Sequence, residues 1–158
     1  MEIVLILHNI RSVHNVGSIF RTADGFGVSK IYLSGYTPNW HDALPHVQAK
    51  ILRQIYKTAL GAEKIVVSEY VAKTTTLIKN LRASGFRIVG LEQDPHSVRI
   101  NEYSAPKKVA LLLGEEVHGI EPNLRDLCDD LVEIQMRGQK ESFNVSVATG
   151  IALYELRR

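Results

Sequence analysis

Short apolar runs recur along the chain, separated by segments in which apolar residues return every three or four positions. Runs that are apolar at almost every position are typical of parallel strands covered on both faces of a sheet. They predict strands at 3–7 (IVLIL), 30–33 (KIYL), 65–68 (IVVS), 86–91 (FRIVGL), 109–113 (VALLL) and 131–134 (LVEI).

The segments between these runs have helical periodicity and helix-ending residues. The apolar residues of VGSIFRTA share one face of a helix that begins after Asn15 and ends at Gly25 and Gly27. Further helices are expected at 45–61, at 75–84, from Pro122, and over SFNVSVATGIALYEL at 142–156. The alternation predicts an α/β fold with a mostly parallel sheet flanked by helices. A length of 158 residues with 45% hydrophobic content suits one domain over 1–158.

The composition of the chain limits its kinds of partner and its cellular compartment, but it does not indicate one function. Nineteen Lys and Arg against seventeen Asp and Glu give a formal net charge of +2, so a nucleic-acid partner would have to be met by a local basic patch. The one cysteine, Cys128, excludes an internal disulfide and is interpreted as structural. There is no signal-like N-terminus and no apolar run near the roughly 20 residues of a membrane helix, so we expect a cytoplasmic protein.

Several kinds of site lack the motif they need. Glu115, Glu116 and His118 cluster, but they lack the i, i+4 histidine pair of a zinc protease, and no metal is expected. The chain has neither G-x-x-x-x-G-K-[ST] nor G-x-G-x-x-G after a strand, and it has no G-x-S-x-G. Nucleotide-phosphate cradles and serine-hydrolase chemistry therefore have little support.

Two junctions between elements carry polar or small residues suited to a ligand. The run at 109–113 ends abruptly at Gly114 and Glu115, and ligands of open α/β sheets bind at the carboxyl ends of strands. Ser142, Asn144 and Ser146 gather where the last helix begins, and a helix start offers free backbone N–H donors. Each of these three could also be a simple helix cap. The two junctions together predict a pocket for a polar ligand.

Two segments carry residues that suit an RNA partner. The loop at 34–44 contains Tyr36, Trp40 and His41. These aromatic side chains either stack on unpaired bases or fold back onto their own domain. The expected helix at 45–61 carries Lys50, Arg53 and Lys57. These basic side chains either approach phosphates or are merely solvated.

Three ordered blocks carry a resemblance to a known family. They are NVGSIFRTA at 15–23, LLLGEEVHG at 111–119 and IQMRGQKESFNVSVA at 134–148. The blocks strongly resemble the three motifs of the SpoU family, in the SPOUT superfamily of methyltransferases. With the strands and helices between them, the resemblance covers essentially the whole chain. Gln135 stands where the family commonly has Pro, which leaves that loop less rigid, and Phe143 is bulkier than the usual Leu.

The resemblance implies that S-adenosylmethionine is used to methylate a ribose 2′-hydroxyl in tRNA or rRNA. Because no appended RNA-binding domain is visible, we expect tRNA, which a compact dimer could grip, rather than rRNA. The resemblance also implies a C-terminal deep trefoil knot, although chain threading is nearly absent from proteins. Similar proteins are homodimers whose active site is completed across the interface. The residues then expected to bind the cofactor are Leu113, Gly114, Gly119, Ile134, Met136, Ser142 and Phe143.

The catalytic residues that the resemblance implies are all polar. They are Asn15, Arg21, Glu115, Ser142 and Asn144. The family assigns activation of the 2′-hydroxyl to the arginine that matches Arg21, with help from a substrate phosphate. Deprotonating an arginine at pH 7 would cost roughly 7 to 9 kcal/mol, so a cationic Arg21 that holds phosphate and stabilises the developing alkoxide is the alternative. From its position alone, Arg21 could also be a solvated surface residue.

Two other functional classes are open. One is an RNA-binding protein that has kept the fold without catalysis, which the retained polar set disfavours. The other is an α/β enzyme that acts on a small metabolite, which predicts turnover without RNA.

Overall fold

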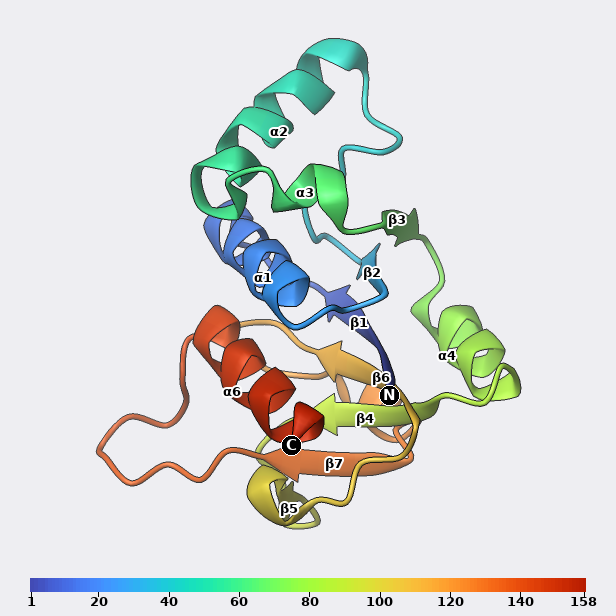
Figure 1. Cartoon of the computed structure of the whole chain (residues 1–158), viewed down its shortest axis with the longest axis vertical. Coiled ribbons are helices and arrows are strands. Elements are labelled where there is room, and N and C mark those ends of the chain that lie inside the picture. The colour runs from blue at the N-terminus through green and yellow to red at the C-terminus, as the bar shows by residue number, and fades with distance from the viewer.

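The computed structural model describes residues 1–158 and contains one seven-stranded sheet in which every strand pair is parallel. The strands are β1 (Glu2–His8), β2 (Lys30–Ser34), β3 (Ser68–Val71), β4 (Arg87–Leu91), β5 (Val98–Arg99), β6 (Lys108–Leu113) and β7 (Asp130–Glu133). Their order across the sheet is β3-β2-β1-β6-β4-β7-β5 (Figure 1). The predicted parallel α/β class is confirmed.

Helices cover both faces of the sheet. They are α1 (Val13–Gly25), α2 (Pro45–Ala59), α3 (Ala62–Ile65), α4 (Thr74–Ala83), α5 (Pro122–Arg125) and α6 (Val145–Arg157), with a 3₁₀ turn η1 (Ile100–Glu102). α1 packs against α2 and α6, so the first and last long helices lie side by side on one face (Figure 1). None of the helices combines the length and apolar character needed to cross a membrane.

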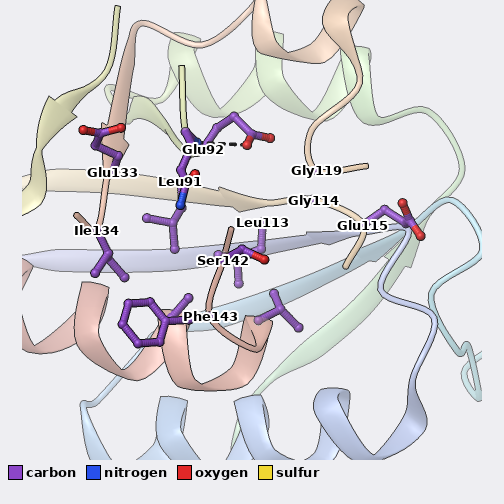
Figure 2. A pocket seen from close by; sticks show the side chains of 13 residues that line it. Leu91, Glu92, Leu113, Gly114, Glu115, Gly119, Glu133, Ile134, Ser142 and Phe143 are labelled. Atoms are coloured by element: carbon purple, nitrogen blue, oxygen red, sulfur yellow. Dashed lines mark hydrogen bonds between the residues drawn. The ribbon is translucent and has the colours of Figure 1, made fainter. Parts of the chain in front are cut away.

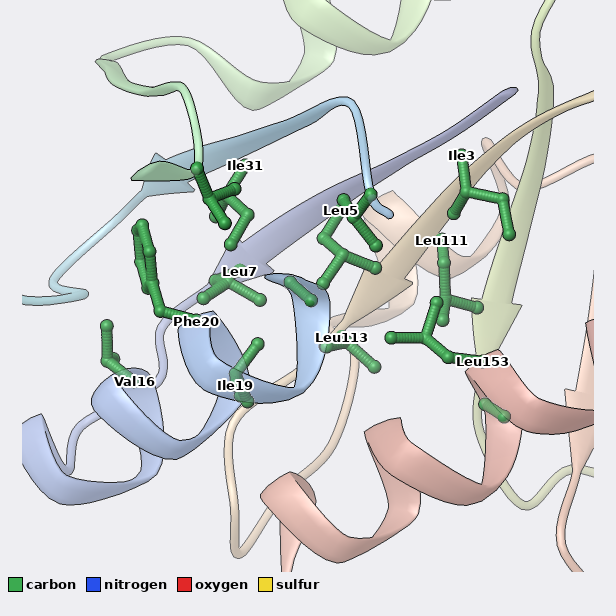
Figure 3. Close-up of a cluster of buried hydrophobic side chains, with 14 of the residues drawn as sticks. Ile3, Leu5, Leu7, Val16, Ile19, Phe20, Ile31, Leu111, Leu113 and Leu153 are labelled. Carbon is green, nitrogen blue, oxygen red and sulfur yellow. The ribbon is translucent and has the colours of Figure 1, made fainter. Parts of the chain in front are cut away.

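The central strands β1 and β6 are apolar at every interior position because both of their faces are buried. In β1, Ile3, Leu5 and Leu7 pack with α1 and α6 on one face (Figure 3). The intervening Val4 and Ile6 pack with α4 and α5 on the other face. The alternation of a strand's side chains thus supplies two separate cores from one apolar run.

The strand predicted at 65–68 is wrong. Residues Ala62–Ile65 form α3, and β3 begins only at Ser68, which lies opposite Ile31 of β2. Ile65 and Val67 are 68% and 61% exposed, and only Val66 of this run is buried. Periodicity cannot separate a short apolar strand from the end of a buried helix, and here the packing of α3 on α1 and α2 decided.

The other predicted elements are present with small shifts at their ends. α1 begins two residues before Asn15, because the Ser12 side chain caps it by accepting a hydrogen bond from the Asn15 backbone N–H at 3.2 Å. The crossing at 92–108, expected to be irregular, contains β5 and η1. η1 packs against α6, so this crossing lies over the C-terminal helix.

Cys128 lies three residues beyond α5, and burial raises the pKa of its thiol to about 12. The thiolate is the reactive form, so we expect alkylation of the native protein at pH 7 to be far slower than alkylation of a free thiol. The measurement is the rate of iodoacetamide labelling with and without denaturant. Equal rates in both conditions would contradict the structural role.

Candidate active site

A hollow opens at the carboxyl ends of β4, β6 and β7, the edge of the sheet where ligands of open α/β folds bind (Figure 2). Gly90 lies opposite Leu112, and Leu91 lies opposite Val132, so these three strands end side by side. The hollow has a cavity volume of about 110 Å³. It is lined by Leu91, Glu92, Gln93, Leu113, Gly114, Glu115, Gly119, Glu133, Ile134, Ser142, Phe143, Val145 and Ala148.

The second and third sequence blocks therefore meet in one pocket, as the resemblance implied. Every residue expected to bind the cofactor lines it except Met136. Met136 is half-buried and lies three residues beyond the end of β7, where the chain has left the pocket rim. Of the expected catalytic residues, Glu115 and Ser142 line the pocket, whereas Asn15, Arg21 and Asn144 do not.

The loop after β6 is closed on itself by backbone hydrogen bonds. Glu115 N–H donates to the Gly119 carbonyl at 3.0 Å, and Gly119 N–H donates to the Glu115 carbonyl at 2.8 Å. A Cβ on Gly114 would collide with the backbone of Gly119 and Ile120. A larger residue at 114 would therefore open the loop before it reached any ligand. The glycine is therefore required by the loop itself.

Glu92 is a pocket residue that the motifs did not reveal. One of its carboxylate oxygens accepts a hydrogen bond from Ile120 N–H at 2.7 Å, and the other accepts from Gln93 N–H at 2.9 Å. In Figure 2 its side chain reaches toward the segment at Gly119. Its position at the end of β4 is the signal that could have indicated it, because ligands gather at the carboxyl ends of strands.

The lining of the pocket is suited to S-adenosylmethionine. Leu91, Leu113, Ile134, Phe143, Val145 and Ala148 provide an apolar surface for a flat ring. Glu92, Glu115 and Glu133 are the acidic residues of the lining and make it negatively charged. A ligand that combines an adenine ring with a positively charged sulfonium matches both features.

Beside the pocket, a chain of hydrogen bonds joins all three sequence blocks. Asn144 Nδ2 donates to Asn15 Oδ1 at 3.1 Å, and Asn15 Nδ2 donates to Glu116 Oε1 at 3.3 Å. Asn144 Oδ1 accepts from the backbone N–H of Ser146, so it also caps α6. The alternative of a helix cap is therefore observed for Asn144, whereas its role toward a ligand stays a prediction.

Glu116, which was not expected to take part, fixes the start of α1. Its carboxylate accepts hydrogen bonds from Arg11 N–H at 3.1 Å and from Ser12 N–H at 3.2 Å, in addition to Asn15. Burial disfavours its charged form, but these hydrogen bonds outweigh burial and lower its pKa. Glu116 therefore stays ionised throughout the neutral range.

The neighbouring Glu115 is buried and faces its own loop. One carboxylate oxygen accepts a hydrogen bond from His118 N–H at 2.6 Å, and the other lies 3.5 Å from Arg11 Nη2. Its geometry suits a residue that holds the loop and Arg11 in place.

Arg21 projects from α1 and is exposed, as its helical position predicted. No hydrogen bond or salt bridge holds its guanidinium. It is free to bind a ligand that approaches this face of α1.

We expect Glu116→Gln to lower the free energy of unfolding by about 1–3 kcal/mol, because an amide cannot accept from all three donors and at least one is left unsatisfied. Glu69→Gln is the matched control, since Glu69 forms only a surface ion pair with Lys30 at 3.0 Å and its loss should cost less than about 1 kcal/mol. Urea denaturation of both variants measures the difference.

The lowered pKa of Glu116 also predicts how the stability that Glu116 contributes changes with pH. A lowered pKa in the folded state gives stability that is present above the ordinary glutamate pKa and is lost as the pH falls through the lowered value. The deficit of Glu116→Gln should therefore shrink only in acid. A deficit that is unchanged down to pH 2 would contradict an ionised Glu116.

The fold and the pocket together define a parallel α/β protein whose ligand site is built from the loops after β6 and β7. The model of the SpoU rRNA Methylase family matches residues 2–154. The chain belongs to this family.

Similar proteins include a tRNA (guanosine(18)-2′-O)-methyltransferase of Aquifex aeolicus, 31% identical over 99% of this chain and 69% of the relative. A 23S rRNA (guanosine-2′-O-)-methyltransferase of Coxiella burnetii is 32% identical over 99% of this chain, which spans 58% of that relative. Among solved structures, an AdoMet-bound rRNA methyltransferase from Sinorhizobium meliloti is similar with a TM-score of 0.86 and 29% identity, over 99% of this chain and 56% of that one.

Proposed function

We propose that this protein transfers the methyl group of S-adenosylmethionine to a ribose 2′-hydroxyl in RNA. The observation that carries the proposal is the pocket in which the second and third family motifs meet, lined by both apolar and acidic residues. The similar Sinorhizobium meliloti methyltransferase, whose structure contains AdoMet, supports the choice of cofactor.

The cofactor supplies an electrophilic methyl group, and the protein has to align the acceptor oxygen with it and stabilise charge. The new bond forms between the ribose oxygen and the methyl carbon as the carbon–sulfur bond breaks, and the hydroxyl proton leaves to a base. We propose that Ser142, which lines the pocket, lies between the cofactor and the acceptor ribose. Asn15 and Asn144, which are hydrogen-bonded to each other, hold this part of the site in its orientation. Arg21 binds the substrate phosphate or ribose oxygen, either as a cation or as the base.

We further propose a homodimer. Arg21 does not line the pocket of its own chain, so a second copy that brings Arg21 to this pocket would complete the site. Val147 and Tyr154 on α6 are 51% and 61% exposed and would be covered by that contact. Light scattering at micromolar concentration tests the assembly.

The same proposal includes a trefoil knot formed within a single domain over 1–158. The packing of η1 on α6 supports it, because the crossing between β4 and β6 then lies over the C-terminal segment. The bidentate pair of Arg87 with Asp130, together with the Tyr103 hydroxyl on Asp130 at 2.7 Å, fastens this crossing to β7.

For the substrate we favour tRNA over rRNA and expect the enzyme in the cytoplasm. Exposed Lys50, Arg53 and Lys57 on α2 offer a basic surface for a phosphate backbone. The similar enzymes include one that acts on tRNA and one that acts on 23S rRNA. Mass mapping of ribose methylation in RNA from a strain that lacks the protein would identify the nucleotide.

A methyl-transfer assay with unmodified tRNA and rRNA transcripts tests the proposal, with RNase-treated transcripts as the control. Methylation that disappears after RNase treatment is the expected result. Turnover that persists would favour a small-metabolite enzyme. Absence of S-adenosylmethionine binding in calorimetry would favour an RNA-binding protein without catalysis.

A further inference from the structure

Arg11 and Tyr36 form an exposed cation–aromatic pair outside the three family blocks. The guanidinium carbon of Arg11 lies 5.8 Å from the centre of the Tyr36 ring. Tyr36 is 52% exposed, and the Arg11 side chain is 72% exposed. An aromatic ring and a guanidinium plane are the two surfaces on which proteins stack nucleic-acid bases.

The pair lies next to the proposed active site. Arg11 Nη2 is 3.5 Å from Glu115 Oε1, and Glu115 lines the pocket. The Arg11 backbone N–H donates to Glu116, which also binds Asn15. Arg11 therefore connects Tyr36 directly to the loop that forms the pocket rim.

The backbone that carries Tyr36 is held rigidly. Tyr36 N–H donates to Asn9 Oδ1 at 3.0 Å, and the Tyr70 hydroxyl donates to the Gly35 carbonyl at 3.0 Å. Asn9 is buried with a φ of 59°, a region that few non-glycine residues adopt, and its Nδ2 donates to Glu121 at 2.8 Å. A Cβ at Gly35 would collide with the Asn9 side chain. A ring that projects from so constrained a turn is pre-organised, so little entropy is lost when it binds a ligand.

The other aromatic residues of this loop are engaged in the protein. Trp40 is only 5% exposed, and its ring lies 5.5 Å from that of Phe20. His41 stacks on Trp40 at 5.1 Å, and its Nε2 is 3.0 Å from the Ser68 hydroxyl. For Trp40, the alternative of folding back onto the domain is therefore the correct one, and Tyr36 is left as the aromatic that can receive a base.

We propose that Arg11 and Tyr36 bind an unpaired base of the RNA that lies next to the methylated ribose. This inference rests on the proposed RNA methylation and adds a contact for its substrate. Stacking accepts any base, so the pair would position the neighbouring nucleotide and not select its identity. The Arg11 side chain is largely exposed and cationic, so it can also approach the adjoining phosphate.

The test compares the affinity of in vitro transcribed tRNA for the wild-type protein, Tyr36→Ala, Tyr36→Phe and Val98→Ala by fluorescence anisotropy. Val98 is the control, because it is also an exposed large apolar residue, at 45%, but lies on β5, outside the pocket lining and away from the basic surface of α2. Loss of one stacked base should weaken binding by about 5- to 150-fold in Tyr36→Ala. Tyr36→Phe keeps the ring and should bind within about two-fold of wild type, as should Val98→Ala. S-adenosylmethionine affinity should be unchanged in all three variants, which would show that the pocket is intact.

A blunt RNA duplex and parallel methylation assays separate the possible failures. Tyr36→Ala should bind the duplex as the wild type does, and an equal loss on duplex and tRNA would overturn stacking on an unpaired base. Wild-type affinity of Tyr36→Ala for tRNA would overturn the inference while leaving RNA methylation in place. If wild-type protein binds tRNA through Tyr36 but methylates no transcript, the proposed reaction fails and the base contact stands. If the wild type binds no RNA, both fail.

Discussion

Arg21→Ala is expected to lower single-turnover methylation by at least about 10²- to 10³-fold, the typical cost of removing one preorganised donor from a transition state. The fold should survive, because Arg21 is exposed and forms no hydrogen bond or salt bridge, whereas α1 is packed through Val16, Ile19, Phe20 and Ala23. The measurement is the rate of methyl transfer to an RNA already established as a substrate of the wild-type protein.

The substitution Arg21→Lys distinguishes the effect of the positive charge from the effect of the planar guanidinium group. Lysine keeps the positive charge but loses the fork that can hold a phosphate and a ribose oxygen together, so we expect it to rescue little of the rate. S-adenosylmethionine affinity and the dimer should be retained in both variants. Near-normal methylation by Arg21→Ala would remove this residue from the proposed mechanism.

Ala148→Phe is expected to weaken S-adenosylmethionine binding by roughly 5- to 150-fold, because a ring placed on the wall of the pocket must be forced aside at a cost of about 1–3 kcal/mol. Ala148 lines the pocket from α6 and is only half-buried, so the larger side chain has space in the ligand-free protein. This change tests the pocket more cleanly than a substitution at Gly114, which would disturb the loop itself. Isothermal titration calorimetry gives the affinity.

Ala83→Phe provides the matched control for that variant. Ala83 is exposed at the end of α4, away from the pocket, and its substitution should leave the affinity within about two-fold of wild type. Thermal melting shows whether each variant is folded, and Ala148→Leu offers a smaller block if Ala148→Phe is not. An unchanged affinity in a folded Ala148→Phe would mean that the cofactor binds elsewhere.

The sequence alone determined the class of fold and the family. Strands buried on both faces are apolar at every position, so the runs at 3–7 and 109–113 could be recognised without any knowledge of their partners. The three ordered blocks identified the family because their residues occur together and in order. A helix cap or a strand end alone would not require this combination of residue types. The run at 65–68 was misread because three apolar residues and a serine are too few to show a period, and packing then decided between helix and strand.

Only the tertiary structure decided how the polar residues are used. Glu115 and Glu116 are adjacent in sequence, yet one faces its own loop and the other binds the start of α1, because the turn after β6 directs them differently. Glu92 and Ala148 reach the pocket from β4 and α6, and Tyr36 reaches Arg11 across the ends of two strands. These contacts join residues 25 or more positions apart, and no local pattern records them, since each residue's neighbours in space are set by strand order and not by its neighbours in sequence.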